Sequence, residues 1–166
     1  MNIYLIGMMG SGKSTVGKIL AKKMDLPFVD LDHYMEVKNN KSISEIFKND
    51  GESHFRELES YALSHIEKSK VLVACGGGVV LSKTNRNKLR STGIVVFLNA
   101  SIPEIAKRLK DAIDRPLLQE NERIQELTKI WNERKDYYKK TAHIMVNTDR
   151  QSPEEISESI YTQIDS

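Results

Sequence analysis

The run Gly7-Met8-Met9-Gly10-Ser11-Gly12-Lys13-Ser14 has the residue types and spacing of a phosphate-binding loop, G-x-x-x-x-G-K-[ST]. Glycines allow successive backbone N–H groups to point at phosphate oxygens. Lys13 would reach the β- and γ-phosphates, and Ser14 would offer its hydroxyl to Mg²⁺. The motif therefore predicts a site for a nucleoside triphosphate with magnesium.

The surroundings of this loop match what the chemistry requires. An apolar strand candidate, Ile3–Ile6, precedes it, and an amphipathic helix candidate, Lys13–Met24, follows it. The positive end of that helix would face the phosphates. The motif by itself does not separate a kinase from a switch GTPase or a motor ATPase.

Two carboxylates, Asp30 and Asp32, follow the second strand candidate, Pro27–Val29. If the extended conformation continues, alternation points both the same way at the edge where open α/β sheets bind ligands. One could hold magnesium through water, and the other could accept a proton from a substrate hydroxyl. Surface or helix-capping aspartates are an equally good interpretation of the spacing.

Three consecutive glycines, Gly76, Gly77 and Gly78, follow the strand candidate Val71–Ala74. They would allow a ligand to approach the backbone closely, although a flexible turn is the simpler alternative. Many P-loop ATPases carry an acidic residue for magnesium at such a strand end. Here the strand ends Val73-Ala74-Cys75, so Asp30 or Asp32 would have to supply that carboxylate.

Three arginines are candidate anion ligands, although none is distinctive alone. Arg56 and Arg134 lie in helical patterns. Arg115 lies in the charged, proline-interrupted stretch 111–121, which reads as a mobile surface loop. An arginine there fits a lid that closes over phosphates and neutralises charge in the transition state.

Short apolar runs alternate with amphipathic segments along the chain. This alternation predicts a parallel sheet covered by helices on both faces. The remaining strand candidates are Ile94–Leu98 and Ile144–Val146. The other helix candidates are Ser42–Lys48, Glu52–Lys68, Ser82–Ser91, Ser101–Lys110, Glu122–Lys140 and Pro153–Ile164, with capping boxes at Ser42, Ser101 and Ser152.

Bulk properties favour a single domain that stays in the cytoplasm. The 166 residues carry a net charge of +2, too mild to indicate a nucleic-acid partner. No apolar run approaches the ~20 residues that span a membrane. A single cysteine, Cys75, excludes an intrachain disulfide, and the four histidines show no metal-ligand spacing with it.

These motifs, in this order, are similar to those of the shikimate kinase family nearly end to end. Beyond the P-loop, the most specific are Asp-x-Asp at 30–32, Phe-Arg-x-x-Glu at 55–59, the triple glycine, and Arg-Pro-Leu-Leu at 115–118. Further matches are Ser44-Glu-Ile-Phe47, Gly51-Glu52, Glu133-Arg134 through Tyr138, and Asn147-Thr-Asp149 before Pro153.

The resemblance implies the reaction ATP + shikimate → ADP + 3-phosphoshikimate, in chorismate and aromatic amino-acid biosynthesis. It also implies a P-loop NTPase fold: a three-layer α/β/α sandwich with a five-stranded parallel sheet. Residues 1–166 would form one kinase domain, with a helical substrate-binding region at about 31–60 and a lid at about 110–122. ATP and shikimate would be its partners, and it would be a monomer.

The resemblance also assigns roles. Lys13, Asp32 and Arg115 would be catalytic, and Ser14 and Asp30 would hold magnesium. Shikimate would contact Asp32, Arg56, Arg134, backbone N–H groups of Gly76–Gly78, and a wall made by Phe47 and Phe55. ATP would bind Gly10, Ser11, Gly12, Lys13, Ser14, Thr15, Arg108, Arg115 and Gln151.

Two departures from the family pattern leave helix geometry and nucleotide affinity open. Lys135-Asp136 follow Arg134 where many members have a nearby proline, and Gln151 stands where arginine is frequent. A gluconate- or nucleoside-monophosphate-type kinase is the nearest alternative, but it lacks the arginine pair and the triple glycine. A GTP-dependent regulator is disfavoured because Asn87-Lys88 continues as Leu89-Arg90, not as Asn-Lys-x-Asp.

Overall fold

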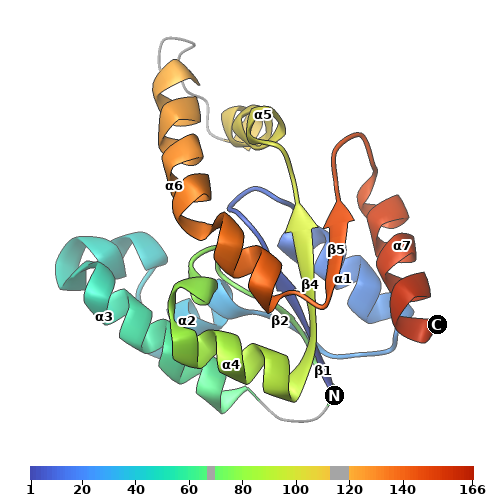
Figure 1. The fold of residues 1–166 in the computed structure, drawn as a ribbon. Helices are drawn as coiled ribbons and strands as arrows, with labels where there is room; N and C mark the ends of the chain where they lie inside the picture. The colour runs from blue at the N-terminus through green and yellow to red at the C-terminus, as the bar shows by residue number, and fades with distance from the viewer. Residues whose placement is uncertain (67–69, 113–119) are drawn as a thin grey trace.

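A computed structural model describes residues 1–66, 70–112 and 120–166. In these ranges five parallel strands form one sheet in the order β2-β3-β1-β4-β5, as Figure 1 shows. The expected five-stranded parallel sheet is confirmed. The strands are β1 Asn2–Ile6, β2 Phe28–Asp30, β3 Leu72–Ala74, β4 Gly93–Asn99 and β5 Ile144–Asn147.

Helices cover both faces of this sheet (Figure 1). Two of them, α1 and α7, pack together on one face, and α2 to α6 lie on the other. Their bounds are α1 Lys13–Lys23, α2 Leu31–Asn39, α3 Ile43–His65, α4 Lys83–Thr92, α5 Ile102–Ala112, α6 Glu120–Thr141 and α7 Pro153–Asp165, with a 3₁₀ turn η1 at Val79–Leu81. None of the helices in the described ranges is long and apolar enough to cross a membrane.

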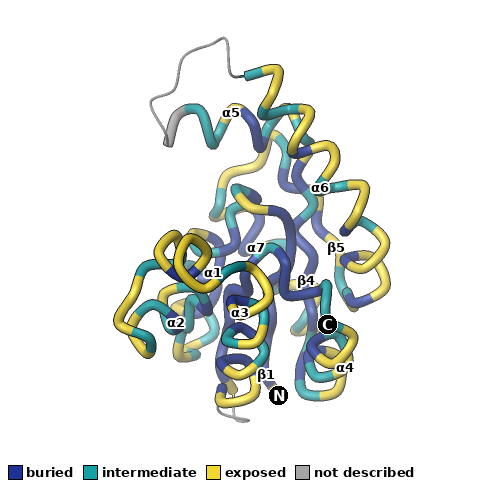
Figure 2. The backbone as a smooth tube through the Cα atoms, turned by 90° about the vertical axis from the view of Figure 1, so that its left-hand side faces the viewer, coloured by how far each residue is buried: buried dark blue, intermediate teal, exposed yellow. Residues whose placement is uncertain are grey.

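The central strand β1 is apolar from Ile3 to Ile6 because its side chains enter the core on both faces of the sheet. Ile3 and Leu5 point into the core beneath α1 and α7, and Tyr4 and Ile6 point into the core on the opposite face. All are buried, as the dark centre of Figure 2 shows. A parallel strand buried on both faces needs a continuous apolar run, and this strand delivers the P-loop to the carboxyl edge of the sheet.

Side-chain caps start several helices where the sequence predicts them. Ser42 accepts a hydrogen bond from the backbone N–H of Glu45, and Ser152 and Glu155 form a complete capping box with Pro153 at the first helical position. Ser101 accepts from the backbone N–H of Glu104 at 3.4 Å. The predicted separation of two helices near residue 50 corresponds to a kink in α3 at Gly51, where φ is +82°.

Of the two interpretations of Asp30 and Asp32, the extended strand with alternating side chains is wrong, and the helix-capping aspartate is correct for Asp30. The strand β2 ends at Asp30, and α2 begins at Leu31; the residue pattern did not indicate this helix, but it lies in the helical region at about 31–60 that the family resemblance implies. Asp30 is the N-cap of α2 and accepts a hydrogen bond from the backbone N–H of His33 at 3.2 Å. Asp32 therefore lies in the first helical turn, because the capping aspartate ends the strand two residues before Asp32, whereas alternation assumes extended backbone as far as Asp32.

Gly17 tests how tightly α1 packs on the sheet. An added Cβ would lie 2.6 Å from a ring carbon of Phe28 and 3.3 Å from methyl groups of Leu5 and Leu72. Although alanine gains ~1 kcal/mol in helix propensity, overpacking costs about 1–3 kcal/mol. We expect Gly17→Ala to lower the free energy of unfolding, measured by urea denaturation. The exposed Lys18→Ala control should stay within about 0.5 kcal/mol of wild type, and a more stable Gly17→Ala would contradict this packing.

Candidate active site

The P-loop adopts the backbone conformations that its glycines permit. Gly7, Gly10 and Gly12 have φ values of +148°, +74° and +94°, which are strained for other residues. Gly12 is the N-cap of α1, so the first N–H groups of that helix point toward the loop. The loop is thus shaped to present backbone donors to an anion.

Lys13 lies inside this loop. Its Nζ donates hydrogen bonds to the carbonyls of Gly7 and Met8, both at 2.8 Å, and the residue is buried. Burial lowers the pKa of Lys13 to about 8, against the opposing attraction of the Asp32 and Asp30 carboxylates. An incoming phosphate would restore the preference for the charged form.

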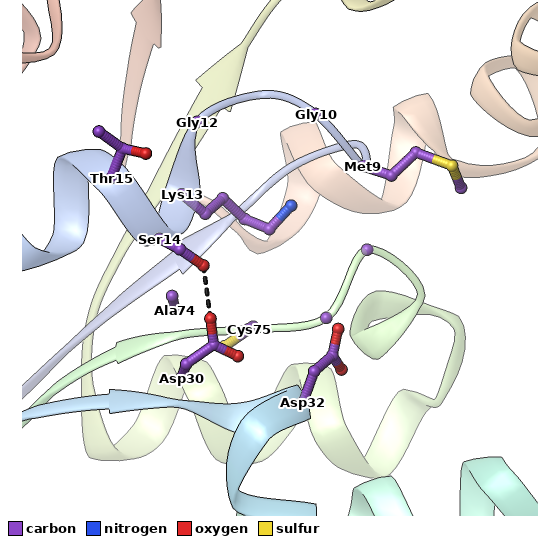
Figure 3. Close-up of a pocket in the computed structure, with 12 residues that line it drawn as sticks. Met9, Gly10, Gly12, Lys13, Ser14, Thr15, Asp30, Asp32, Ala74 and Cys75 are labelled. Atoms are coloured by element: carbon purple, nitrogen blue, oxygen red, sulfur yellow. Dashed lines mark hydrogen bonds between the residues drawn. The ribbon is translucent and has the colours of Figure 1, made fainter. Parts of the chain in front are cut away.

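Two oxygen ligands suited to a hard cation meet beside Lys13. The Ser14 hydroxyl donates to Oδ2 of Asp30 at 2.5 Å, as the dashed line in Figure 3 shows. The described residues contain no cluster of three His, Cys, Asp or Glu side chains that could hold a metal ion. A metal here would take ligands from Ser14, Asp30, water and phosphate, which is how Mg²⁺ usually binds.

Asp32 lies on the far side of the same cavity from Ser14 (Figure 3). Its Oδ1 is buried and has no hydrogen-bond partner among the described residues. Burial raises the pKa of this carboxyl, and the neighbouring charge of Asp30 raises it further, while Lys13 opposes the shift. Asp32 is therefore a stronger base than an exposed aspartate.

The three glycines after β3 are explained by close approach and not by backbone conformation, since their φ values are not positive. A Cβ on Gly76 would lie 2.8 Å from Glu59 and 3.0 Å from Asp32. On Gly77 it would lie 3.4 Å from Arg134, and on Gly78 it would overlap the guanidinium group of Arg56. Gly76 and Gly78 therefore make room for charged groups of the site, whereas Gly77 lies at the limit of ordinary contact with Arg134.

Two glutamates of its own helix hold Arg56 against the three glycines Gly76–Gly78, called the glycine strip below. Its Nη1 contacts Oε1 of the buried Glu59 at 3.0 Å, and its Nη2 contacts the exposed Glu52 at 3.5 Å. The Nε of Arg56 is buried and donates to no described atom. The guanidinium group is thus oriented and still has an unsatisfied donor for an anionic ligand.

Arg134 approaches the glycines from α6 and completes the cationic pair. It is buried, and its Nε also lacks an acceptor within the described residues. Phe47 and Phe55 of α3 pack with ring centroids 4.4 Å apart and line the same cavity. The second cavity is therefore lined by two guanidinium groups and two stacked aromatic rings.

These residues line two adjoining cavities. The first, about 340 Å³, is lined by P-loop residues with Asp30, Asp32 and Cys75. The second, about 480 Å³, is lined by Phe47, Phe55, Arg56, Arg134 and the three glycines. Met9, Asp32, Gly76 and Gly77 border both cavities, so the groups for phosphate and for an anionic acceptor converge at Asp32.

The predicted residues at the adenine end lie outside both cavities. Arg108 lies beside the P-loop, donating to the carbonyl of Gly10 at 3.1 Å and to Glu104 at 3.3 Å. Gln151 lies in the turn between β5 and α7 and donates to the carbonyl of Asn147 at 2.5 Å. Arg115 and most of the expected lid fall in 113–119, outside the described residues.

Comparison with known proteins decides the family. The family model described as "Shikimate kinase" matches residues 9–165. The chain belongs to the shikimate kinase family. It is 43% identical to a shikimate kinase from Sulfurihydrogenibium sp. over 98% of this chain and 97% of that protein. The one from Paracidovorax citrulli is 40% identical over 90% of this chain and 84% of its own.

Solved structures of shikimate kinases share this fold. The enzyme from Acinetobacter baumannii, in complex with shikimate, has a TM-score of 0.90 and 36% identity, covering 98% of this chain and 92% of its own. The shikimate kinase from Aquifex aeolicus has a TM-score of 0.83 and 33% identity, covering 99% and 96% of the two chains. The fold and family expected from the sequence are both confirmed.

The sequence analysis gave no role to two residues that the structure places at this shikimate kinase site. Glu59 orients Arg56, and Tyr138 donates to the carbonyl of Gly77. A helical-spacing signal was available for Glu59, which occupies a position on the same face as Phe55, Ala62 and Leu63. An ionisable residue on an otherwise buried face is a candidate site residue.

Lys13 generates a prediction about proton uptake. With a pKa of about 8 in the free protein, the side chain is about half neutral at pH 8, and nucleotide phosphates should return it to the charged form. Binding of ADP at pH 8 should therefore take up about half a proton, measured by calorimetry in buffers of different ionisation enthalpy. Lys13→Met provides the control, and equal uptake by both proteins would contradict this assignment.

Proposed function

We propose that this protein transfers the γ-phosphoryl group of ATP to the 3-hydroxyl group of shikimate, giving 3-phosphoshikimate and ADP. The observation that carries the proposal is the junction of the two cavities at Asp32. On one side lies a phosphate-binding loop, and on the other lie two partly unsatisfied arginines that suit a carboxylate. Shikimate bears a carboxylate and ring hydroxyls, so it can span this arrangement.

The two arginines would hold the carboxylate of shikimate. A guanidinium group pairs with a carboxylate through two parallel hydrogen bonds, which fixes the direction of the acid. The buried Nε atoms of Arg56 and Arg134 have no other acceptor among the described residues. Phe47 and Phe55 would wall the ring, and the backbone N–H groups of the glycine strip would bind its hydroxyls.

Asp32 would receive the proton of the reacting hydroxyl. Its pKa is raised by burial, which makes it a better proton acceptor than an ordinary aspartate while Lys13 nearby favours the ionised form. Lys13 would contact the β- and γ-phosphates in place of the carbonyls of Gly7 and Met8. Because the transferred group carries spread negative charge, positioning and charge neutralisation provide most of the catalysis.

Magnesium fits the oxygen ligands present. Ser14 would bind the ion directly and Asp30 would hold it through water, as the family resemblance implies, and their hydrogen bond at 2.5 Å supports a shared site for the two oxygens. When bound, the ion would neutralise charge on the β- and γ-phosphates. Arg115 would add a further positive charge from the lid. Arg108 and Gln151 would contact the adenine end, and a monomeric, cytoplasmic enzyme stays a prediction.

A coupled assay for ADP release tests the acceptor. Turnover with shikimate should exceed turnover with gluconate or nucleoside monophosphates by at least about a hundredfold. Gluconate has a carboxylate but no ring to hold its hydroxyls in fixed directions, and nucleoside monophosphates have no carboxylate for the two arginines. Equal rates with all three acceptors would reject the proposal.

The carboxylate assignment predicts the effect of Arg56→Lys. Lysine keeps the charge but loses the two-pronged geometry, so a charge-assisted bond worth about 1.5–3 kcal/mol is lost. The KM for shikimate should rise by about 10- to 100-fold, with the KM for ATP within about twofold of wild type. Arg90→Lys, at the opposite edge of the sheet, is the matched control, and an unchanged shikimate KM in Arg56→Lys rejects the role.

The proton-acceptor assignment predicts the effect of Asp32→Asn. The amide keeps the shape of the side chain but cannot accept the proton, and general base catalysis contributes about 10²–10⁴-fold. We expect kcat to fall by at least about a hundredfold while shikimate still binds. The exposed Asp136→Asn serves as control. A kcat within a few-fold of wild type would exclude Asp32 as an essential base.

A further inference from the structure

Tyr138 joins α6 to the glycine strip through a contact that the proposed chemistry does not use. Its hydroxyl donates a hydrogen bond to the carbonyl oxygen of Gly77. The residue is fully buried, and it lies one helical turn after Arg134 on the same face of α6. Arg134 itself approaches the Gly77 backbone, since an added Cβ there would lie 3.4 Å from its Nη1.

The ring of Tyr138 is fixed by an aromatic stack. Its centroid lies 5.1 Å from that of Phe97 on β4, with ring planes inclined by 15°, and 6.3 Å from that of Trp131 on α6. Stacked rings in a packed core have few alternative rotamers. The hydroxyl therefore comes to Gly77 from a rigid support. Burial raises the pKa of Tyr138, so the hydroxyl keeps the proton that it donates.

The hydrogen bond to the carbonyl of Gly77 also fixes the direction of the N–H of Gly78. In a trans peptide the carbonyl of Gly77 and the N–H of Gly78 lie in one plane and point in opposite directions. A bond that holds the carbonyl therefore holds the N–H as well. Within the described chain, the N–H groups of Gly77 and Gly78 have no acceptor, and both glycines line the second cavity.

Three consecutive glycines need an external hydrogen bond to fix their conformation more than residues with side chains do. Three residues without side chains have wide conformational freedom. The only backbone hydrogen bonds that follow immediately belong to η1, from Val79 to Gly76 and from Leu81 to Gly78, among the described residues. The next part of the chain is also anchored, because Arg86 donates to the carbonyls of Val80 and Leu81 at 2.7 and 3.2 Å.

We infer that Tyr138 is a positioning residue for the acceptor substrate: its hydroxyl orients the Gly77–Gly78 peptide so that the N–H of Gly78 faces the shikimate cavity. The inference rests on the proposed function, because shikimate is the ligand that this N–H would meet. Tyr138 lies on α6, the helix that also carries Arg134. A single helix would thus align a guanidinium group and a backbone donor on the same ligand.

The test is Tyr138→Phe, which keeps the ring stack and removes only the hydroxyl. Loss of the hydroxyl should raise the KM for shikimate about three- to tenfold. The substitution also removes the hydrogen bond between Tyr138 and Arg134, so weaker protection of the amides of residues 76–81 from hydrogen exchange in the shikimate complex must accompany the KM change; a KM change with unchanged protection would assign the effect to Arg134 and overturn the inference. The KM for ATP and kcat should stay within about twofold of wild type, because the P-loop and Asp32 are untouched. An unchanged KM for shikimate would overturn the inference.

Tyr4→Phe is the matched control for a purely structural effect. Tyr4 is also buried, and its hydroxyl bonds to Asn2 at 3.0 Å and Thr92 at 2.8 Å, away from both cavities. Both variants should lower the Tm, but only Tyr138→Phe should change the KM for shikimate. Equal KM changes in both variants would show a general loss of stability and overturn the inference.

Binding can also be measured without turnover. Trp131, the single tryptophan of the chain, lies in the aromatic stack, so its emission can follow a shikimate titration. The Kd should rise in parallel with the KM in Tyr138→Phe and stay unchanged in Tyr4→Phe. If wild type neither binds nor phosphorylates shikimate, the proposed function fails; if wild type does both and the Kd of Tyr138→Phe is unchanged, only the positioning role fails.

If Tyr138→Phe proves too unstable to assay, hydrogen exchange at low temperature gives the same answer. Shikimate should protect the amides of residues 76–81 less in Tyr138→Phe than in Tyr4→Phe. Equal protection in the two variants would overturn the inference.

Discussion

The absence of side chains at Gly76, Gly77 and Gly78 is the constraint on which the site depends. Asp32 and Glu59 converge on the first glycine, Arg134 on the second and Arg56 on the third. These groups come from α2, α3 and α6, so the strip is where three helices reach the same short stretch of backbone. A side chain on Gly76 or Gly78 would push a charged group out of place, and one on Gly76 would also disturb the common border of the two cavities.

The acids and cations around the glycine strip nearly balance one another, and the remaining unsatisfied donors favour an anionic ligand. Each buried acid has a nearby cation: Glu59 pairs with Arg56 at 3.0 Å, and Lys13 stabilises the ionised form of Asp32. The compensation is incomplete, because Arg56 and Arg134 keep buried donors without acceptors in the described chain. Desolvated, partly satisfied cations favour an anionic ligand strongly, since binding replaces an unmet hydrogen bond in a low-dielectric site. The lowered pKa of Lys13 has the same origin.

The parallel sheet brings these groups together in a simple way. The central strand β1 pairs with β3 on one side and β4 on the other, and β2 pairs with β3. The carboxyl ends of β1, β2 and β3 carry the P-loop, Asp30 and the glycine strip, and parallel pairing puts these ends at one edge of the sheet. Asp30 has a second task there, because it caps α2 and thereby sets where Asp32 stands. Asp30 is thus both the predicted magnesium ligand and the residue that starts the helix carrying Asp32, the predicted base.

The sequence by itself determined the sheet, most of the helices and the location of the P-loop, because these depend on local spacing: apolar runs, capping residues and glycines at fixed intervals. It also supplied the triple glycine as a place where a ligand could approach the backbone. Arg56 and Arg134 became specific candidates only as members of a family pattern, since arginines in amphipathic helices are ordinary singly. The alternation rule gave the wrong direction for Asp32. The backbone N–H of His33 donates a hydrogen bond to Asp30, and this capping bond starts a helix where the rule assumes that the strand continues. Tertiary structure alone decided three further features: the role of Glu59, the contact of Tyr138 with Gly77, and the reason for the three glycines. Each depends on side chains from elements far apart in the sequence reaching one backbone segment, and such distances are set by packing, which no local pattern encodes.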